Sequence, residues 1–334
     1  MKYLVTGAAG FIGSATVKKL NAQGHEVVGI DNINDYYDVE LKHARLSFIK
    51  NPSFRFLQID ISNRAEMEAL FEKENFDRVI HLAAQAGVRY SLENPHCYVE
   101  SNVTGYLNIL EGCRQNSVQH LVYASSSSVY GLNSKVPFAT SDSVDHPISL
   151  YAATKKSNEL MAHCYSHLYQ IPTTGLRLFT VYGSWGRPDM APFIFTKKIL
   201  DGETIDINNS GELWRDFTHI IDIVEGIVRI ADVIPVQNAQ WKEETGSPAS
   251  SSAPFAVYNI GHGSPINLMD FIYGIENELG IEAKKNFRNM QPGDVYQTYA
   301  DTEDLYAVTG YRPVVSIQEG IAEFVSWYRE FYNK

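Results

Sequence analysis

Residues 3–31 read YLVTGAAGFIGSATVKKLNAQGHEVVGID, and this stretch decides the fold. Its apolar start predicts a buried strand, and Glu26–Ile30 predicts a second one. Between them, three glycines precede a stretch whose apolar residues recur at helical spacing as far as Leu20. Strand, helix and strand over about 30 residues make a βαβ unit with a right-handed crossover.

The three glycines have separate physical tasks in this unit. Gly7 permits the tight turn, Gly10 lets the backbone approach a pyrophosphate, and Gly13 lets the helix pack close to the strand. The helix N-terminus then offers free N–H groups and a partial positive charge to the phosphates. Asp31 ends the second strand, where its carboxylate would accept hydrogen bonds from ribose hydroxyls and repel a 2′-phosphate. The unit therefore predicts binding of NAD in preference to NADP.

Strand and helix patterns continue to alternate beyond this unit. Strands are expected at 54–58, 78–84, 120–124 and within 172–178, and helices at 64–74, 96–116 and 151–169. This alternation predicts an α/β fold, a Rossmann-type doubly wound parallel sheet. Small or polar residues follow the expected strands, and ligands bind beyond the carboxyl ends of such strands.

The second half of the chain is expected to form a smaller α/β substrate domain. We place the NAD-binding domain at residues 1–178, with the chain returning to it around 217–262, and the second domain at 179–334. Residues 236–254 are polar and rich in Ser, Ala and Pro, which predicts an exposed, flexible loop.

Composition limits the class of protein. The 334 residues carry 28 Lys and Arg against 39 Asp and Glu, a formal net charge of −11. No basic stripe interrupts this acidic surface, so nucleic-acid binding is not expected. The three cysteines lack metal-ligand spacing and fit a reducing, cytoplasmic environment. The chain has no run of about 20 apolar residues, so no membrane span is expected.

A tyrosine and a lysine are the residues that point to chemistry. Tyr151 and Lys155 stand four residues apart on an expected helix, so they lie on one face, and Ser125–Ser128 follow the strand at 120–124. A tyrosine with a pKa near ~10 is a poor base. A nearby ammonium and a positively charged nicotinamide both favour the phenolate, so we expect its pKa to fall. The group can then remove a proton from a sugar hydroxyl while hydride leaves its carbon. A solvent-exposed Tyr–Lys pair without chemistry is the alternative.

These motifs together carry a family resemblance. The sequence resembles an extended short-chain dehydrogenase/reductase of the nucleotide-sugar epimerase/dehydratase family through TGAAGFIG, HLAAQAGVRYS, SSSSVYG, YAATK and RDFTHIIDIVEGI, and the likeness covers nearly the whole chain. It implies an NAD-dependent isomerase with Tyr151 as base, Lys155 on the nicotinamide ribose and Ser126 beside them. It also implies a nucleotide sugar bound at 179–334 and a homodimer built from helices 96–116 and 151–169.

The resemblance assigns two sets of binding residues. The set expected at NAD is Gly7, Gly10, Phe11, Ile12, Gly13, Asp31, Asn32, Asp60, Ile61, Leu82, Ala83, Ala84, Asn102, Tyr151 and Lys155. The set expected at the UDP-sugar is Ser127, Ser128, Thr180, Arg187, Arg215, Arg288 and Asp294. In the second set Arg215 is expected at the diphosphate, with Arg288 and Asp294 near the nucleoside. Arg89 faces the substrate or has a structural role.

The reaction expected from the resemblance is 4-epimerisation. Family dehydratases carry an Asp-Glu pair where this chain has Ser127 and Ser128, and decarboxylating members place a Glu in this loop, so both reactions are disfavoured. Oxidation at C4, rotation of the bound keto-sugar and return of hydride to its other face remain. This sequence of steps has no net redox change, so NAD can stay bound throughout.

Two further segments suggest the sugar. WGRPDM at 185–190 and NDYYDVELKHARL at 34–46 are similar to UDP-glucuronate 4-epimerases, enzymes that supply UDP-galacturonate for surface polysaccharides. Arg187 is expected to pair with the C6 carboxylate of the uronate, with a diphosphate contact or a structural ion pair as alternatives. A neutral UDP-hexose or N-acetylhexosamine as substrate, and a non-catalytic NAD-sensing regulator, are the rival functions.

Overall fold

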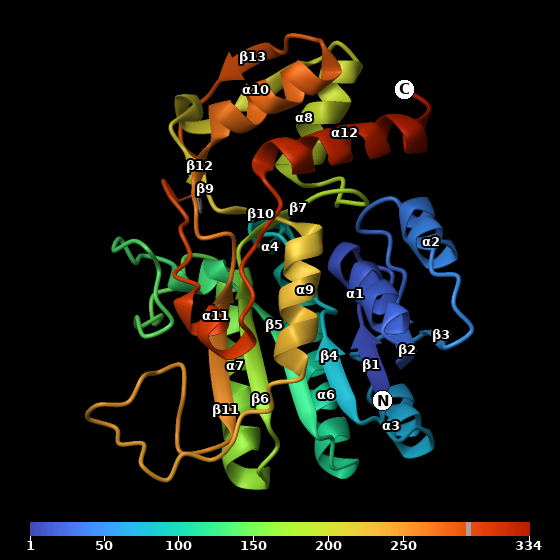
Figure 1. Cartoon of the computed structure of the whole chain (residues 1–334), viewed down its shortest axis with the longest axis vertical. Coiled ribbons are helices and arrows are strands. Elements are labelled where there is room, and N and C mark those ends of the chain that lie inside the picture. The colour runs from blue at the N-terminus through green and yellow to red at the C-terminus, as the bar shows by residue number, and fades with distance from the viewer. Residues whose placement is uncertain (292–294) are drawn as a thin grey trace.

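A seven-stranded parallel sheet forms the centre of the molecule, in the order β11-β6-β5-β4-β1-β2-β3 (Figure 1). The structure is a computed structural model that describes residues 1–291 and 295–334. The strands are β1 (Lys2–Thr6), β2 (Glu26–Asp31), β3 (Phe54–Gln58), β4 (Arg78–His81), β5 (His120–Ser126), β6 (Thr173–Leu178) and β11 (Phe255–Ile260). The order reverses between β1 and β4, and ligands of doubly wound sheets bind beyond the carboxyl ends at that point.

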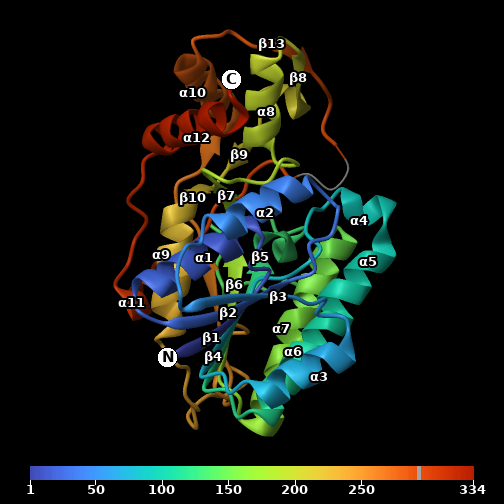
Figure 2. The ribbon, with the colours of Figure 1, turned by 90° about the vertical axis from the view of Figure 1, so that its right-hand side faces the viewer.

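Helices cover both faces of this sheet (Figure 2). One face carries α1 (Phe11–Ala22), α9 (Ile220–Ala231) and α11 (Glu303–Thr309), and the other carries α3 (Arg64–Lys73), α6 (Gly105–Gln115) and α7 (Leu150–Tyr169). Neighbouring residues of β1 serve opposite cores, because side chains alternate along a strand. Leu4 packs in the cluster of Phe71 and Ile109, whereas Val5 packs in that of Ile223. Burial on both faces explains why the strands read as continuous apolar runs.

The edge at β11 lies in the segment that was expected to return to the first domain around 217–262. Six strands were expected, and β11 adds a seventh by pairing with β6 in parallel. Residues 232–254 run as turns and irregular chain, as predicted for a loop, but they are not wholly exposed. Ala249 and Ala253 are buried and pack in the cluster that contains Phe255. The physical reason is that the outermost strand of a sheet needs cover on its apolar face.

A second group of elements lies beyond the carboxyl ends of the strands (Figure 1). Its helices are α8 (Ala191–Leu200), α10 (Leu268–Leu279) and α12 (Ile317–Tyr332). Its strands form three pairs, which are β7 (Thr180–Tyr182) with β10 (Phe217–His219), β8 (Thr204–Ile207) with β13 (Lys284–Phe287), and β9 (Trp214–Arg215) with β12 (Ile266–Asn267). Phe193, Phe271 and Phe324 belong to its own core cluster. The chain leaves this group at α9, which covers the main sheet.

The helix expected at 96–116 is divided into three parts. It begins after the short α4 (Tyr90–Glu93) as α5 (Pro95–Val99), passes through a π-helical turn, η1 (Glu100–Thr104), and continues as α6. A π-helical turn inserts an extra residue into the ladder and is frequent at functional sites. The remaining elements are α2 (Val39–Ser47) and the short 3₁₀ turns η2 (Ser127–Tyr130) and η3 (Asn208–Gly211).

Within the described residues, no helix is both long enough and apolar enough to cross a bilayer.

A buried histidine on β5 makes stability depend on pH. His120 is fully buried, with Nδ1 3.0 Å from the Ala231 carbonyl and Nε2 2.8 Å from Thr174 Oγ1. Burial lowers its pKa from 6.5 to about 4. In the unfolded chain His120 therefore takes up a proton near pH 6.5, whereas in the folded chain it does so only near pH 4. As the pH is lowered through this window, the free energy of unfolding should therefore fall by about 1.4 kcal/mol per pH unit because of His120.

Urea unfolding of His120→Gln between pH 6.5 and 4.5 tests this. We expect the variant to lose about 1.4 kcal/mol per pH unit from the wild-type slope of unfolding free energy against pH. The exposed His96 gives the matched control, and His96→Gln should keep the wild-type slope. An unaltered slope in His120→Gln would contradict the assignment.

Candidate functional site

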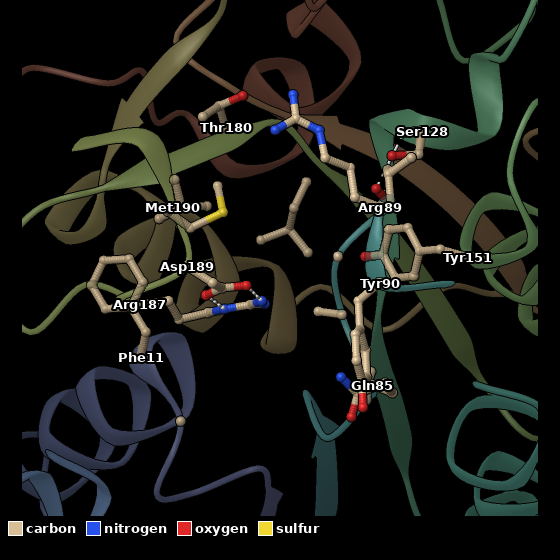
Figure 3. Close-up of a pocket in the computed structure, with 18 of the residues that line it drawn as sticks. Phe11, Gln85, Arg89, Tyr90, Ser128, Tyr151, Thr180, Arg187, Asp189 and Met190 are labelled. Atoms are coloured by element: carbon tan, nitrogen blue, oxygen red, sulfur yellow. Dashed lines mark hydrogen bonds and ion pairs between the residues drawn. The ribbon is translucent and has the colours of Figure 1, made fainter. Parts of the chain in front are cut away.

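A cavity of about 1000 Å³ lies between the carboxyl ends of the sheet strands and the second group of elements. It brings together residues that are far apart in sequence, some from the predicted NAD set and some from the predicted UDP-sugar set. The predicted residues that line it are Gly7, Gly10, Phe11, Ile12, Gly13, Asp31, Asn32, Asp60, Ile61, Leu82, Ala83, Ala84, Ser126, Ser127, Ser128, Tyr151, Lys155, Thr180, Arg187, Arg215 and Arg288. Figure 3 shows side chains from both halves of the chain directed into it.

The glycine loop after β1 fits a dinucleotide. Gly7 has φ +72°, and a Cβ on it would lie 2.8 Å from the Ala83 nitrogen, so no side chain fits between the loop and β4. A Cβ on Gly13 would lie 1.9 Å from the Gly7 carbonyl oxygen, which is the close helix–strand packing that the sequence predicted. Gly10 caps α1 with extended backbone and lines the cavity. The loop and the start of α1 therefore form a side-chain-free cradle in which backbone N–H groups can meet phosphates.

Two carboxylates stand at the ends of β2 and β3. Asp31 accepts hydrogen bonds from the backbone N–H groups of Ala9, at 3.2 Å, and Ile33, at 2.9 Å. Burial is the largest influence on Asp31 and raises its pKa. Asp60 is also partly buried, but hydrogen bonds from Asn32 and Ser62 outweigh that burial and lower its pKa. Asn32 thus holds Asp60 in place, at 2.8 Å.

Ser126, Tyr151 and Lys155 come together as predicted. Ser126 and Tyr151 both line the cavity and interact with each other, and the Lys155 ammonium donates to the Ala124 carbonyl at 2.9 Å. Burial lowers the pKa of Lys155 to about 8. The expected fall in the pKa of Tyr151 included the effect of a positively charged nicotinamide, and the structure holds no dinucleotide. Burial raises the pKa of Tyr151 and outweighs the opposing hydrogen bond from Ser126, while the ammonium is directed to a backbone carbonyl.

A buried ion pair beneath these residues was missed by the sequence analysis. Glu159 accepts hydrogen bonds from Ser125 Oγ at 2.7 Å and from Arg177 at 2.9 and 3.0 Å. Arg177 also donates to Tyr130, whose hydroxyl donates to Asn259 on β11. The available signal was the position of Glu159, eight residues after Tyr151 and therefore near the same helix face. Its partner on β6 could not be inferred from spacing.

Asn102 has a supporting position in the structure. It is fully buried in the π-helical turn, where its side chain bonds the backbone N–H and carbonyl of Gln85 at 2.8 and 3.0 Å and reaches Thr154 at 3.1 Å. Gln85 lines the cavity. Asn102 was expected at NAD, but it is not among the residues that line the cavity; because it bonds Gln85 and Thr154, it braces the cavity wall against α7.

Most predicted cations on the sugar side already have carboxylate partners. Arg187 forms an ion pair with Asp189, at 2.9 Å for Nε and shorter for Nη2, so the structural-ion-pair alternative is present in the structure. Arg288 pairs with Asp206 at 2.9 Å. Arg215 donates to the Trp214 carbonyl. Asp294 lies outside the described residues.

One further cation lines the cavity. The Arg89 side chain, from the loop after β4, extends into the cavity (Figure 3). The sequence left this residue between a substrate contact and a structural role. Its place in the cavity lining leaves the substrate contact as an expectation.

Comparisons with known proteins agree with this geometry. Residues 3–239 match a family model described as the NAD dependent epimerase/dehydratase family. A probable UDP-glucuronate 4-epimerase of Rhizobium meliloti (strain 1021) is 48% identical over 336 residues, covering 100% of this chain and 98% of the relative.

Solved structures are similar over the whole chain. The UDP-glucuronic acid 4-epimerase of Bacillus cereus, in complex with UDP-glucuronic acid and NAD, is 34% identical with a TM-score of 0.86 and covers 99% of this chain and 100% of that one. The UDP-glucose 4-epimerase of Thermotoga maritima with UDP-glucose is 29% identical with a TM-score of 0.85, at the same coverage.

Asp31 provides a test of cofactor choice. Because a carboxylate that accepts from ribose hydroxyls contributes about 1.5–3 kcal/mol, Asp31→Ala should weaken NAD binding about tenfold or more. NADP should lose far less, so the ratio of the two dissociation constants should approach one. Titration of NAD-free protein with each dinucleotide measures both constants. The exposed Asp35→Ala is the control, and equal ratios in wild type and Asp31→Ala would refute the assignment.

Proposed function

The chain belongs to the NAD-dependent epimerase/dehydratase family, and we propose that it interconverts UDP-glucuronate and UDP-galacturonate by 4-epimerisation. One observation carries this proposal. Tyr151, Lys155 and Ser126 line one cavity with the dinucleotide cradle, and the loop after β5 presents Ser127 and Ser128 there. The loop thus presents serines where a dehydratase or a decarboxylase would carry an acid, and Tyr151 is the proposed base for C4 oxidation.

The residues of the chain divide the proton chemistry between them. Bound NAD supplies hydride acceptance and return at its nicotinamide. Tyr151 removes the proton from the C4 hydroxyl as hydride leaves C4, and Ser126, which lines the cavity with Tyr151, holds the sugar hydroxyl in line. Burial raises the pKa of Tyr151, and a positively charged nicotinamide opposes that rise. Tyr151 then returns the proton after the keto-sugar has rotated, so the two epimers differ only in the face that receives hydride.

The sugar carboxylate is proposed to bind among hydroxyl groups and an arginine. Ser127, Ser128 and Thr180 line the sugar end of the cavity, as does Arg187. The ion pair with Asp189 engages Nε and Nη2 of Arg187 and fixes the guanidinium plane, so Nη1 would meet the carboxylate. A carboxylate held by several donors keeps its bond to C5 away from alignment with the C4 carbonyl, which prevents loss of CO₂. The likeness to a UDP-glucose 4-epimerase keeps a neutral sugar as the second candidate.

The domain assignments and the biological role complete the proposal. We infer that residues 1–178, with the returning chain at 217–262, hold NAD, and that 179–334 hold the nucleotide sugar. UDP-galacturonate is an activated sugar, so the product would be used by glycosyl transfer into surface polysaccharides. Cys97, Cys113 and Cys164 are free, which supports a reducing, cytoplasmic location.

Incubation with UDP-glucuronate, without added NAD and then with it, tests the reaction. Separation of the products should show UDP-galacturonate, and Tyr151→Phe should lower the rate by about 100-fold or more because it removes the base. A UDP-pentose product would instead indicate decarboxylation. Conversion of UDP-glucose alone would favour the neutral substrate, and no conversion of any UDP-sugar would favour a regulator.

Arg187→Ala tests how the carboxylate is recognised. The variant should raise the KM for UDP-glucuronate by about tenfold or more, because a charge-assisted contact contributes about 1.5–3 kcal/mol. Its effect on a neutral UDP-hexose should be smaller. An equal rise in KM for acidic and neutral sugars would contradict the assignment of Arg187 to the carboxylate. Arg89 would then be the next candidate, and Arg89→Ala should raise the KM for UDP-glucuronate more than the KM for the neutral sugar.

The outer side of α6 and α7 supports the proposed homodimer. Leu107 and Leu160 are 40% and 57% exposed, and Leu168 is 66% exposed. Such apolar side chains on neighbouring helices are typical of a subunit interface. Leu160→Glu should convert the dimer to monomer in sedimentation velocity. Val236→Glu, on the equally exposed loop at 232–254, should leave the dimer intact, and a dimeric Leu160→Glu protein would argue against this face.

A further inference from the structure

Residues 32–47 follow β2 along the chain and contact the loop at 185–189. We name this segment the strap. It contains the stretch 34–46 that is similar to UDP-glucuronate 4-epimerases, and the chemistry described above gives it no task. The strap leaves β2 at Asp31 and continues as α2, which lies between α1 and the second group in both views (Figures 1 and 2). Asn34, Tyr36, Tyr37 and Lys42 line the cavity.

Arg45 on α2 is the central residue of the strap. It is 2% exposed, and its guanidinium donates to carbonyls of two separate loops. Nη1 reaches the Ala9 carbonyl of the glycine loop at 3.1 Å. Nε and Nη2 reach the Trp185 carbonyl at 3.1 and 2.7 Å, and Nη2 also reaches the Gly186 carbonyl at 3.1 Å. One buried cation therefore ties the dinucleotide cradle to the loop immediately before Arg187.

The conformation of that loop supports this interpretation. Trp185 has φ +67°, a backbone conformation that non-glycine residues rarely adopt, so the surrounding contacts must hold it. The bonds from Arg45 to the two successive carbonyls are such contacts, and they are charge-assisted. Arg45 is itself fixed, because Nη1 also donates to the Tyr37 hydroxyl at 2.6 Å.

A second contact joins the strap to the same loop. The Tyr36 hydroxyl donates to Asp189 Oδ2 at 3.1 Å, and Asp189 is the partner of Arg187. Lys42 stiffens the strap from inside, since it is buried and donates to the Asn34 carbonyl at 2.6 Å and to its side-chain oxygen at 2.7 Å. The strap thus holds the loop at both ends of the segment 185–189.

We propose that Arg45 is a positioning residue that clamps the Arg187 loop to the dinucleotide cradle, so that the sugar stays aligned with the nicotinamide and NAD is retained through turnover. The inference rests on the proposed function, because an epimerase that released the reduced dinucleotide after the first hydride transfer would leave its keto-sugar without a hydride donor. The clamp acts on both ligands through one group. Loosening it should therefore affect NAD release and sugar binding together.

Arg45→Lys and Arg45→Met test the clamp in the full-length protein. We measure the NAD dissociation rate by dilution of NAD-loaded protein, together with KM and kcat for UDP-glucuronate. Arg45→Met should raise both the NAD dissociation rate and KM by about tenfold or more, the equivalent of about 1.4 kcal/mol each. Arg45→Lys should fall between it and wild type, because an ammonium cannot reach all three carbonyls at once. The control is Arg229→Met, on α9 and paired with Glu225, which should leave both values unchanged.

A purely structural role would lower the melting temperature without changing NAD release from the folded protein, and that result would overturn the proposal. If Arg45→Met does not fold, NAD release and KM are measured in Arg45→Lys and Tyr36→Phe instead. Tyr36→Phe removes only the bond to Asp189 and should raise KM severalfold, with a less than additive effect when combined with Arg45→Lys. Wild-type NAD release and KM in these folded variants would refute the clamp. NAD release is measurable without turnover, so failure of the clamp and failure of the epimerase assignment are distinguishable.

Discussion

The register of α7 against the carboxyl end of β5 is the constraint on which the whole site depends. Lys155 bonds the Ala124 carbonyl, and one turn further along the helix Glu159 bonds Ser125 Oγ. Arg177 lies opposite Ser125 in the sheet and completes a buried pair with Glu159. Removing one partner of such a pair costs about 3–5 kcal/mol, whereas replacing both by apolar groups costs little. The pair is therefore best understood as a register device, since Tyr151 and Ser126 meet only in this register.

The cavity contrasts with the charge of the whole chain. The net charge is −11, yet Lys42, Arg89, Arg187, Arg215 and Arg288 line the space between the two groups of elements. A NAD and a UDP-sugar together carry two diphosphates, so local cations and the start of α1 must overcome the surrounding field. Arg187 and Arg288 already hold carboxylates of the chain, which keeps their guanidinium groups oriented. Net charge thus describes the outer surface and says little about the cavity.

The two halves of the chain cooperate through short, directional contacts. The strap leaves β2, and its Arg45 and Tyr36 bond the loop of Arg187. The cradle for phosphates and the loop for the sugar are consequently held at a set separation. That suits a reaction in which one ligand rotates while the other stays in place.

The sequence by itself determined the parts whose chemistry depends on neighbours along the chain. The βαβ unit, the glycines with their close backbone approach, Asp31, and Tyr151 with Lys155 all depend on spacings of a few residues, and periodicity and turn chemistry specify these directly. The same holds for the alternation that implied a parallel sheet. A loop at 236–254 was also evident from composition, although its buried alanines were not.

Only the tertiary structure decided which distant residues meet. Arg45 and Trp185 are 140 positions apart, and Glu159 and Arg177 are 18 apart. The seventh strand, β11, pairs with β6, which lies far from it in the sequence. The contribution of burial to the pKa of Tyr151 belongs to the same class, because burial depends on everything that packs around the ring. Hydrogen bonds to backbone carbonyls, ion-pair choice and burial are properties of the packed chain, and no local spacing encodes them.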